Sequence, residues 1–295
     1  MTDLPAGYVV SVGEGDRIHF LDWVGPGEGD GVVLIHGLSQ TGWIWAPVAR
    51  RLAGHVPTIA MDLRGHGLSD APTDDGAYDL DVLADDVEAV AEGSGLLDDP
   101  DGRLVLVGHG FGAIVAATAA RRMGPRCRGL VLVDGGWERL ETATGLDVEA
   151  FLREIPEPPE VMASLRAFVR DRRGFHPASW DDDQERAALA TVVETHAGRL
   201  VPATRPHALE ASVRAMFGYD PIATLAGPDA TGRVVALLAS DDREDSRARA
   251  LAELSERRIV AGAAPIRSVP FEATGHNLMR YRPAEVTAEI LTLIP

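Results

Sequence analysis

The sequence predicts an α/β fold in which a mostly parallel, doubly wound sheet carries a helical insertion. Short, continuous apolar runs alternate with helical patterns over residues 1–135, and the same alternation returns over residues 230–295. Between them, residues 136–229 show helical patterns separated by Pro and Gly clusters. Alternating strands and helices are typical of a doubly wound parallel sheet. We therefore expect a core built from 1–135 and 230–295, and a helical cap over 136–229.

The first elements are an edge hairpin and a series of buried strands. The runs 8–12 and 17–21 flank a Gly-Glu-Gly-Asp turn, which favours a short antiparallel edge. The strands after it are apolar without interruption, as in sheets covered by helices on both faces. We expect these strands at 32–35, 58–61, 104–107 and 130–133, with helices at 46–52, 80–91 and 113–123.

The remaining elements belong to the cap and to the end of the sheet. Cap helices are expected at 161–171 and 184–196, and no run in the cap has the pattern of a strand. Beyond the cap we expect strands at 233–239 and 266–271 and helices at 246–258 and 283–293. The chain is thus expected to leave the sheet once, for the cap, and then to return and add the last two strands.

Composition excludes several classes of function. The 295 residues include 45 acidic and 28 basic side chains, and the formal net charge is −17. An acidic surface repels phosphate groups, so nucleic acid and anionic membranes are not expected partners, and a small molecule is. No apolar run approaches the ~18 residues of a membrane span and no signal segment is present, so we expect a cytoplasmic protein. Neither metal-ligand nor nucleotide-binding spacing occurs, so no metal and no cofactor are expected.

Three segments with useful chemistry follow predicted strands, at the edge where an open parallel sheet places its ligand crevice. Residues 36–39 (His-Gly-Leu-Ser) can present the backbone N–H of Leu38 to this crevice. Residues 108–112 (Gly-His-Gly-Phe-Gly) can form a sharp strand-to-helix turn that presents the N–H of Phe111. Residues 275–277 (Gly-His-Asn) contribute His276, a side chain suited to general-base chemistry.

A general-base histidine needs a carboxylate to orient it. Asp241 and Asp242 follow strand 233–239 and are in a suitable position. An aspartate at the end of a strand is also a common cap of the next helix. For each residue the capping and the catalytic roles both stay open.

Together these segments resemble the α/β-hydrolase superfamily over nearly the whole chain. The resemblance rests on residues 33–37 (VLIHG), 62–70 (DLRGHGLSD), 106–109 (LVGH) and 274–277 (TGHN). It implies an oxyanion hole at the amides of Leu38 and Phe111, an acid at Asp242 and a base at His276. Asp134, at the end of strand 130–133, is a second candidate for the acid.

The sequence departs from the family pattern at the nucleophile. The family motif is G-x-S-x-G, and Gly110 stands at its middle position. A glycine has no side chain that can attack a substrate.

Three interpretations of Gly110 follow. The protein is an enzyme that uses His276 and the oxyanion hole without a covalent intermediate, in direct hydrolysis, lyase or cyclase chemistry. Alternatively, Gly110 is an engineered replacement of serine in an ester, lactone or thioester hydrolase, or the protein is a non-catalytic binder of a ligand or partner.

Aromatic side chains are expected to line a hydrophobic pocket above Gly110, for a small carbonyl-containing molecule. Trp43, Trp137 and Phe217 come from segments that should converge there, as do Met216, Phe175 and Trp180. His36, Gly37 and His109 lie beside the crevice and are candidates for substrate contact, although such histidines usually stabilise turns in this family.

Overall fold

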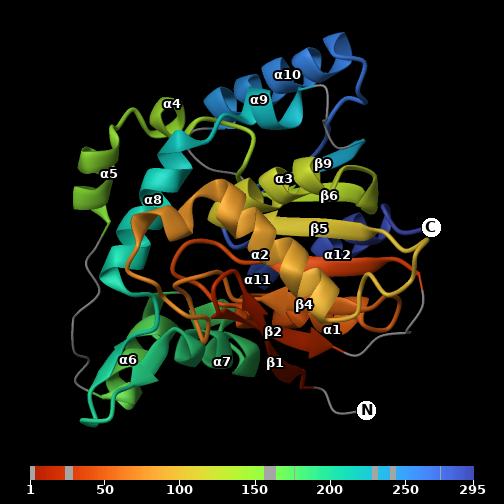
Figure 1. Ribbon diagram of the computed structural model, residues 1–295. Coiled ribbons are helices and arrows are strands. Elements are labelled where there is room, and N and C mark those ends of the chain that lie inside the picture. Colours follow the sequence, from red (N-terminus) through yellow and green to blue (C-terminus); the bar gives the residue numbers. More distant parts are fainter. Residues whose placement is uncertain are drawn as a thin grey trace.

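The computed structural model describes residues 4–23, 29–155, 164–175, 177–227, 232–239, 244–272 and 274–295 (Figure 1). Eight strands form one sheet in the order β1-β2-β4-β3-β5-β6-β9-β10. Strand β2 runs antiparallel to both of its neighbours, and all other pairings are parallel. The strands are β1 (Ala6–Val12), β2 (Asp16–Trp23), β3 (Gly31–Ile35), β4 (Thr58–Met61), β5 (Leu104–His109), β6 (Cys127–Val133), β9 (Arg233–Ala239) and β10 (Arg267–Phe271). The expected mostly parallel sheet and its antiparallel edge are confirmed.

Two layers of helices explain why the central strands are apolar throughout. All residues of β3, β4 and β5 are buried, because apolar helix faces cover both sides of the sheet. One face packs against α1 (Ala46–Leu52), α11 (Leu278–Tyr281) and α12 (Pro283–Leu291). The other face packs against α2 (Leu80–Gly93), α3 (Phe111–Met123), α9 (Pro221–Leu225) and α10 (Glu244–Val260).

The segment between β6 and β9, residues 134–232, is called the insertion below. Its elements are α4 (Leu140–Thr144), α5 (Val148–Glu154), α6 (Leu165–Phe175), α7 (Asp182–Ala190), β7 (Val192–Glu194), β8 (Leu200–Pro202) and α8 (Pro206–Gly218), followed by α9. In Figure 1, α5, α6 and α8 lie on the left of the sheet, whereas both chain ends lie on the right. The division into a core and a cap at residues 136 and 229 stays a prediction.

The insertion differs from the expected run of helices. The helix expected at 184–196 ends at Ala190, and Val192–Glu194 pairs antiparallel with Leu200–Pro202. The absence of strands expected for the cap is therefore wrong. Two adjacent β-branched valines favour the extended backbone, and Gly198, at φ 72°, closes the turn. Of the helix expected at 161–171, residues 161–163 lie outside the described part, and α6 begins at Leu165.

Contacts with the core fix the lower part of the insertion. Nη1 and Nη2 of Arg50 on α1 donate to the carboxylate of Asp183 on α7, at 3.0 and 2.9 Å. Arg186, also on α7, places its guanidinium 5.2 Å from the centre of the Trp43 ring. A bidentate pair of this kind fixes orientation as well as distance. Among the described helices, none combines the length and the apolar character that crossing a bilayer requires.

Candidate active site

The turn between β5 and α3 has the backbone shape of a nucleophile elbow. Gly110 stands at the turn with φ 52° and ψ −114°, a conformation that strains any residue with a side chain. A Cβ on Gly108 would lie 2.1 Å from the carbonyl oxygen of Gly112, and one on Gly112 would lie 2.3 Å from that of His36. The flanking glycines are therefore required by close backbone packing.

Gly110 has different surroundings from the two flanking glycines. A Cβ built on Gly110 would have the Nε2 atom of His276 as its nearest neighbour, at 3.3 Å. The neighbours of this position are side-chain atoms of His276, so the strained φ angle and this close contact with the imidazole oppose a side chain here, and the backbone does not. The position of a nucleophile in an elbow therefore faces the imidazole directly.

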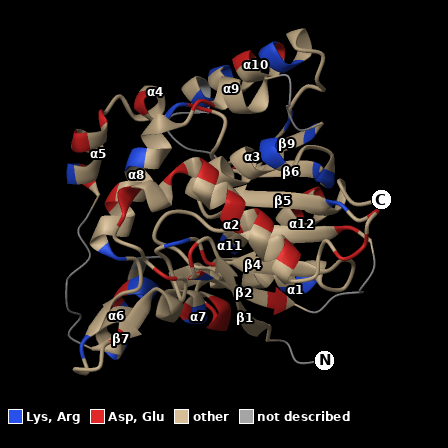
Figure 2. Cartoon of the chain, viewed as in Figure 1, with Lys and Arg blue, Asp and Glu red and all other residues tan. Residues whose placement is uncertain are grey.

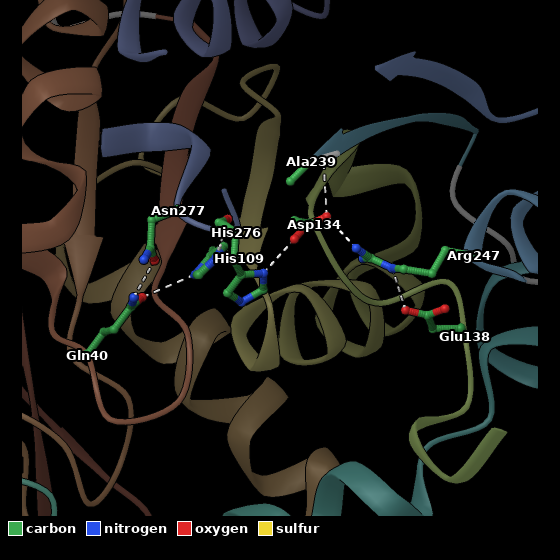
Figure 3. Close-up of polar contacts among 8 residues, drawn as sticks. All are labelled: Gln40, His109, Asp134, Glu138, Ala239, Arg247, His276 and Asn277. Atoms are coloured by element: carbon green, nitrogen blue, oxygen red, sulfur yellow. Dashed lines mark hydrogen bonds and ion pairs between the residues drawn. The ribbon is translucent and has the colours of Figure 1, made fainter. Parts of the chain in front are cut away.

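His276 is oriented by Asp134 (Figure 3). Its Nδ1 lies 2.5 Å from Oδ2 of Asp134, and because a carboxylate only accepts, Nδ1 carries the hydrogen. Nε2 is then the basic nitrogen, and it is the one that faces Gly110. The imidazole is 57% exposed, whereas the Asp134 side chain is 2% exposed. Asp241 and Asp242 lie outside the described residues, and the acid position on His276 is filled by Asp134, the second candidate.

The carboxylate of Asp134 is held in its charged form. Its Oδ1 accepts from the backbone N–H of Ala239 at 3.0 Å and from Nη1 of Arg247 at 2.7 Å. Burial raises the pKa of the Asp134 carboxyl, but the hydrogen bond from His276 and the charge of Arg247 outweigh burial and hold this pKa below its ordinary value. Asp134 itself has φ 49°, an uncommon backbone conformation for a residue other than glycine.

Arg247 is a buried arginine that connects Asp134 to a second carboxylate. Its Nε donates to Glu138 at 2.9 Å, and its guanidinium stacks 4.9 Å from the centre of the Trp137 ring. Burial lowers the pKa of Arg247, but the charges of Asp134 and Glu138 more than reverse this effect. The sequence offers little signal for this role, because Arg247 lies on α10, far from Asp134 along the chain.

Two backbone amides face the same cavity as Gly110 and His276. Leu38 and Phe111 both line this cavity. In the part of the chain that the structure describes, neither amide N–H has a hydrogen-bond partner. Phe111 is the first residue of α3, so the positive end of the helix dipole adds to the potential there. The pair is suited to bind a negatively charged oxygen, as the sequence predicts.

Gln40, His109 and Asn277 link the three loops of the site (Figure 3). Oε1 of Gln40 accepts from the N–H of Gly37 at 3.1 Å, and Nε2 of Gln40 donates to Oδ1 of Asn277 at 2.8 Å. The two ring nitrogens of His109 lie 3.1 Å from Oε1 of Gln40 and 3.1 Å from the carbonyl oxygen of His276. Burial, and then the proximity of His276, hold the pKa of His109 well below its ordinary value.

The sequence does not identify Gln40 as a site residue, and it gives Asn277 no role beyond its place next to His276. The sequence signal for a site role is weak in both cases, because each is a neutral polar residue in a loop after a strand. Only the folded chain brings the loop at 36–40 next to the loop at 274–277.

The cavity over Gly110 has a volume of about 490 Å³. Gly37, His109 and Met216 line it as expected, and Phe151 contributes an aromatic wall. The other lining residues include Gln40, Ile114, Leu140, Ala143, Thr144 and Asn277. Apolar walls around a few convergent polar groups are typical of sites for small molecules.

The aromatic lining expected from the sequence is largely wrong. Trp137 is 1% exposed and lies in the core under the site, and Trp43 packs edge-on against Trp23 with ring centres 6.3 Å apart. Phe217 packs behind Phe151, with ring centres 5.5 Å apart. None of these three side chains lines the cavity, because each packs against other side chains instead.

His36 and the other expected contacts have structural positions. His36 is fully buried; its Nδ1 bonds to the carbonyl oxygen of Gly37 and its Nε2 accepts from the N–H of Leu63, at 2.7 and 2.9 Å. His36 therefore shapes the loop, and it is not among the residues that line the cavity over Gly110. Trp180 lines a neighbouring cavity, and the side chain of Phe175 lies outside the described part. The described residues contain no group of three or more metal-ligating side chains.

Known proteins resemble this chain in sequence and in fold. It is 36% identical over 186 residues to the N-formylmaleamate deformylase of Pseudomonas putida, a match covering 62% of this chain and 63% of that protein. It is 35% identical over 109 residues to the 2-(acetamidomethylene)succinate hydrolase of Mesorhizobium japonicum, covering 37% of this chain and 36% of that protein. The matches thus span less than two thirds of either curated relative.

Solved structures match almost the full chain. A crystal structure of E-2-(acetamidomethylene)succinate hydrolase superposes with a TM-score of 0.77 at 23% identity, covering 98% of this chain and 99% of that one. A thioesterase domain from the curacin biosynthetic pathway superposes with a TM-score of 0.75 at 20% identity, covering 97% and 99%. At these identities the likeness shows the fold. A model of the alpha/beta hydrolase family matches residues 32–290, and the chain therefore belongs to the alpha/beta hydrolase family.

Proposed function

We propose that this chain is a hydrolase that cleaves a small acyl compound by direct attack of water, with His276 as general base and without an acyl-enzyme. One observation carries the proposal: the basic nitrogen of His276 lies 3.3 Å from the position of a Cβ on Gly110, in the cavity that Leu38 and Phe111 also line. Because Gly110 lacks a side chain, a water molecule fits where a nucleophile's side chain would stand.

The reaction needs only groups that this site provides. Nε2 of His276 takes a proton from the water while the water oxygen attacks the substrate carbonyl. The amides of Leu38 and Phe111 donate to the oxygen that becomes negative, and Asp134 stabilises the imidazolium. Collapse of the tetrahedral intermediate expels the leaving group, which takes the proton from His276. A general base contributes about 10²–10⁴-fold and an oxyanion donor about 10²–10³-fold.

The names of the curated relatives support an acyl group as the reacting part. One is named as a deformylase of N-formylmaleamate and the other as a hydrolase of an acetamidomethylene compound. We therefore extend the substrate class from esters to acyl groups bonded to nitrogen. The Asp134–His276 pair disfavours the alternative of a pure binding protein, which has no use for an oriented base.

Pre-steady-state kinetics tests the absence of an acyl-enzyme. With 4-nitrophenyl butyrate, the wild-type protein should release nitrophenolate without a burst and should not react with a fluorophosphonate probe. Gly110→Ser should show both a burst and labelling, because its hydroxyl would lie against Nε2 of His276. A burst or labelling in the wild type would refute the proposal.

The same variant addresses the second interpretation of Gly110, an engineered replacement of serine. The backbone at Gly110 keeps the strained elbow conformation that a nucleophile needs, although a glycine does not require it. If the wild type hydrolyses esters and amides no faster than a variant lacking the imidazole, and Gly110→Ser is active, this second interpretation is correct.

A further inference from the structure

A second cavity lies between the sheet and the insertion, beside the cavity over Gly110. It has a volume of about 400 Å³. The two cavities share Leu38, Gln40 and Asn277 as lining residues, so they meet at the oxyanion loop and the histidine loop. Apart from the shared Leu38, no residue that lines the second cavity has a chemical role in the proposed reaction.

The second cavity is positively charged in an acidic protein. Arg172 of α6 and Arg280 of α11 line it, and its described lining contains no Asp or Glu. The whole chain has a formal net charge of −17, and Figure 2 shows acidic residues on the ribbons of α2 and α7. By contrast, the cavity over Gly110 includes Asp134 and Glu138. Two arginines without a lining carboxylate attract an anion locally, against the repulsion of the rest of the surface.

Contacts with neighbouring side chains hold Arg280 at the cavity. Its Nε donates to Oγ of Ser179 at 3.2 Å, and its guanidinium lies 5.9 Å from the Trp180 ring centre and 5.5 Å from that of Tyr281. Trp180 also lines the cavity. Arg172, which lines the same cavity from α6, has its guanidinium 5.2 Å from the centre of the Phe168 ring. Guanidinium groups bind carboxylates and phosphates through paired hydrogen bonds.

We propose that this second cavity binds an anionic arm of the substrate, a carboxylate or a phosphate, through Arg172 and Arg280, while the acyl group of the same molecule occupies the cavity over Gly110. This inference rests on the proposed hydrolase function and names its substrate class. Leu38 lines both cavities. In the proposed complex its backbone amide binds the reacting carbonyl, and the anionic arm of the substrate extends past Leu38 into the second cavity. The geometry thus selects anionic acyl compounds over neutral ones.

Binding without turnover tests the anionic subsite first. Glutarate and inorganic phosphate, titrated separately, should change the fluorescence of Trp180, and the probe with the lower Kd identifies the anion that the site prefers. The change should vanish in Trp180→Phe. Arg172→Gln and Arg280→Gln should each weaken binding of that probe about tenfold, as expected for a charge-assisted hydrogen bond. Arg280→Lys, which keeps the charge, should bind more tightly than Arg280→Gln.

Arg173→Gln is the matched control, because Arg173 is an exposed neighbour on the same helix that does not line the cavity. It should leave the Kd within about twofold. If neither probe binds, or if all three glutamine variants weaken binding equally, the subsite does not exist. Equal weakening would mean that only overall charge matters.

Turnover then separates the subsite from the proposed reaction. The 4-nitrophenyl monoester of glutarate should have a KM about tenfold below that of 4-nitrophenyl butyrate. Arg172→Gln should remove this difference, whereas the control Arg173→Gln should keep it. If neither ester is hydrolysed but glutarate binds through the two arginines, the proposed function fails and the subsite stands. If both esters are hydrolysed with equal KM values, the subsite is refuted and the function stands.

Discussion

Among the described residues, two aspartate–histidine pairs differ in their exposure, and one of them belongs to the cavity over Gly110. Nδ1 of His19 lies 2.9 Å from Oδ2 of Asp62, and Nδ1 of His276 lies 2.5 Å from Oδ2 of Asp134. The His19 side chain is 9% exposed, whereas that of His276 is 57% exposed. The other ring nitrogen of His19 lies 2.9 Å from the position of a Cβ on Gly7, and that of His276 lies 3.3 Å from the position of a Cβ on Gly110. The same pairing is therefore structural in one region and suited to catalysis in the other.

The surroundings of the two carboxylates explain the difference. Asp62 also accepts from the backbone amides of Gly42 at 2.7 Å and Leu68 at 3.0 Å, so it connects the loops at 42 and 68. Asp134 accepts from Arg247 and Ala239, and its histidine remains open to a substrate. Asp62, which binds several backbone groups, is therefore suited to stabilise the fold. Asp134 leaves the second nitrogen of its histidine accessible and is suited to orient a general base.

The largest contrast is expected on removing the two imidazoles. His276→Ala should lower kcat/KM for 4-nitrophenyl butyrate by about 10²–10⁴-fold, because the general base is lost. Its Tm should stay within about 2 °C of the wild type, since the side chain is largely exposed. His19→Ala should do the reverse, with little change in kcat per folded molecule and a clear fall in Tm. Equal loss of activity in both variants would remove the distinction between the pairs.

Asp134→Asn should lower kcat, because the imidazolium that forms during the proposed reaction loses its counter-charge, whereas Asp62→Asn should leave kcat per folded molecule nearly unchanged. Both substitutions should destabilise the fold. Asp62 accepts from two backbone amides, and Asp134 pairs with the buried Arg247, whose loss of a partner costs about 3–5 kcal/mol of unfolding free energy. Urea denaturation measures the loss of stability, and kcat is measured on the folded fraction. An equal fall in kcat per folded molecule in both variants would contradict the assignment.

Acid stability sharpens the comparison further. For Asp62 and for Asp134, burial raises the pKa of the carboxyl but hydrogen bonds and nearby charges hold it below its ordinary value. An unfolded aspartate has a pKa of about 3.9, so the stabilisation is complete above this pH and is lost as the pH falls through the lower folded pKa. The unfolding free energy should therefore fall steeply below pH ~4, and less steeply in Asp134→Asn.

Asp22 gives a control of opposite sign for the acid series. Burial raises the pKa of the Asp22 carboxyl above its ordinary value. Its charge therefore opposes folding at neutral pH, and Asp22→Asn should leave the acid loss of stability in place. If the unfolding free energy falls less steeply with decreasing pH in Asp22→Asn than in Asp134→Asn, the opposite roles given to these two carboxylates are contradicted.

The smallest effect is expected from Arg247, which acts on His276 only through Asp134. Arg247→Gln should lower kcat about tenfold, as expected when a charge-assisted hydrogen bond is lost. Because the positive charge favours the carboxylate, its removal should raise the pKa of Asp134 and move the acidic limb of the pH–rate profile upward. A merely structural arginine would lower the fraction of folded protein and leave the profile in place.

Local patterns predict much of the fold and suggest part of the candidate site. The strands β3, β5 and β6, the elbow at Gly110 and the proposed base His276 all depend on neighbours along the chain, which a sequence displays. The choice of the acid does not, because Asp134 and Asp242 follow two adjacent strands that end at the same edge of the sheet. In the structure Asp134 lies 2.5 Å from Nδ1 of His276, whereas Asp242 lies outside the described residues.

The other misjudged residues depend on packing between distant segments. Trp137 was expected in the pocket because it follows β6, but the turn directs its ring under Arg247. Gln40 and Asn277 touch each other although 237 positions separate them in the chain. The two short strands β7 and β8 are each three residues long, and segments of that length carry too little periodicity to be recognised.

The missing side chain at Gly110 also determines how competing acceptors should behave in the proposed reaction. A hydroxyl on the elbow would store the acyl group between two half-reactions, so an added alcohol or amine would intercept it after the first product has left. Under the proposed direct attack of water, an alternative acceptor must instead be present together with the intact donor molecule. Added methanol should therefore change the product ratio and the overall rate together, following a sequential rate law instead of a ping-pong one.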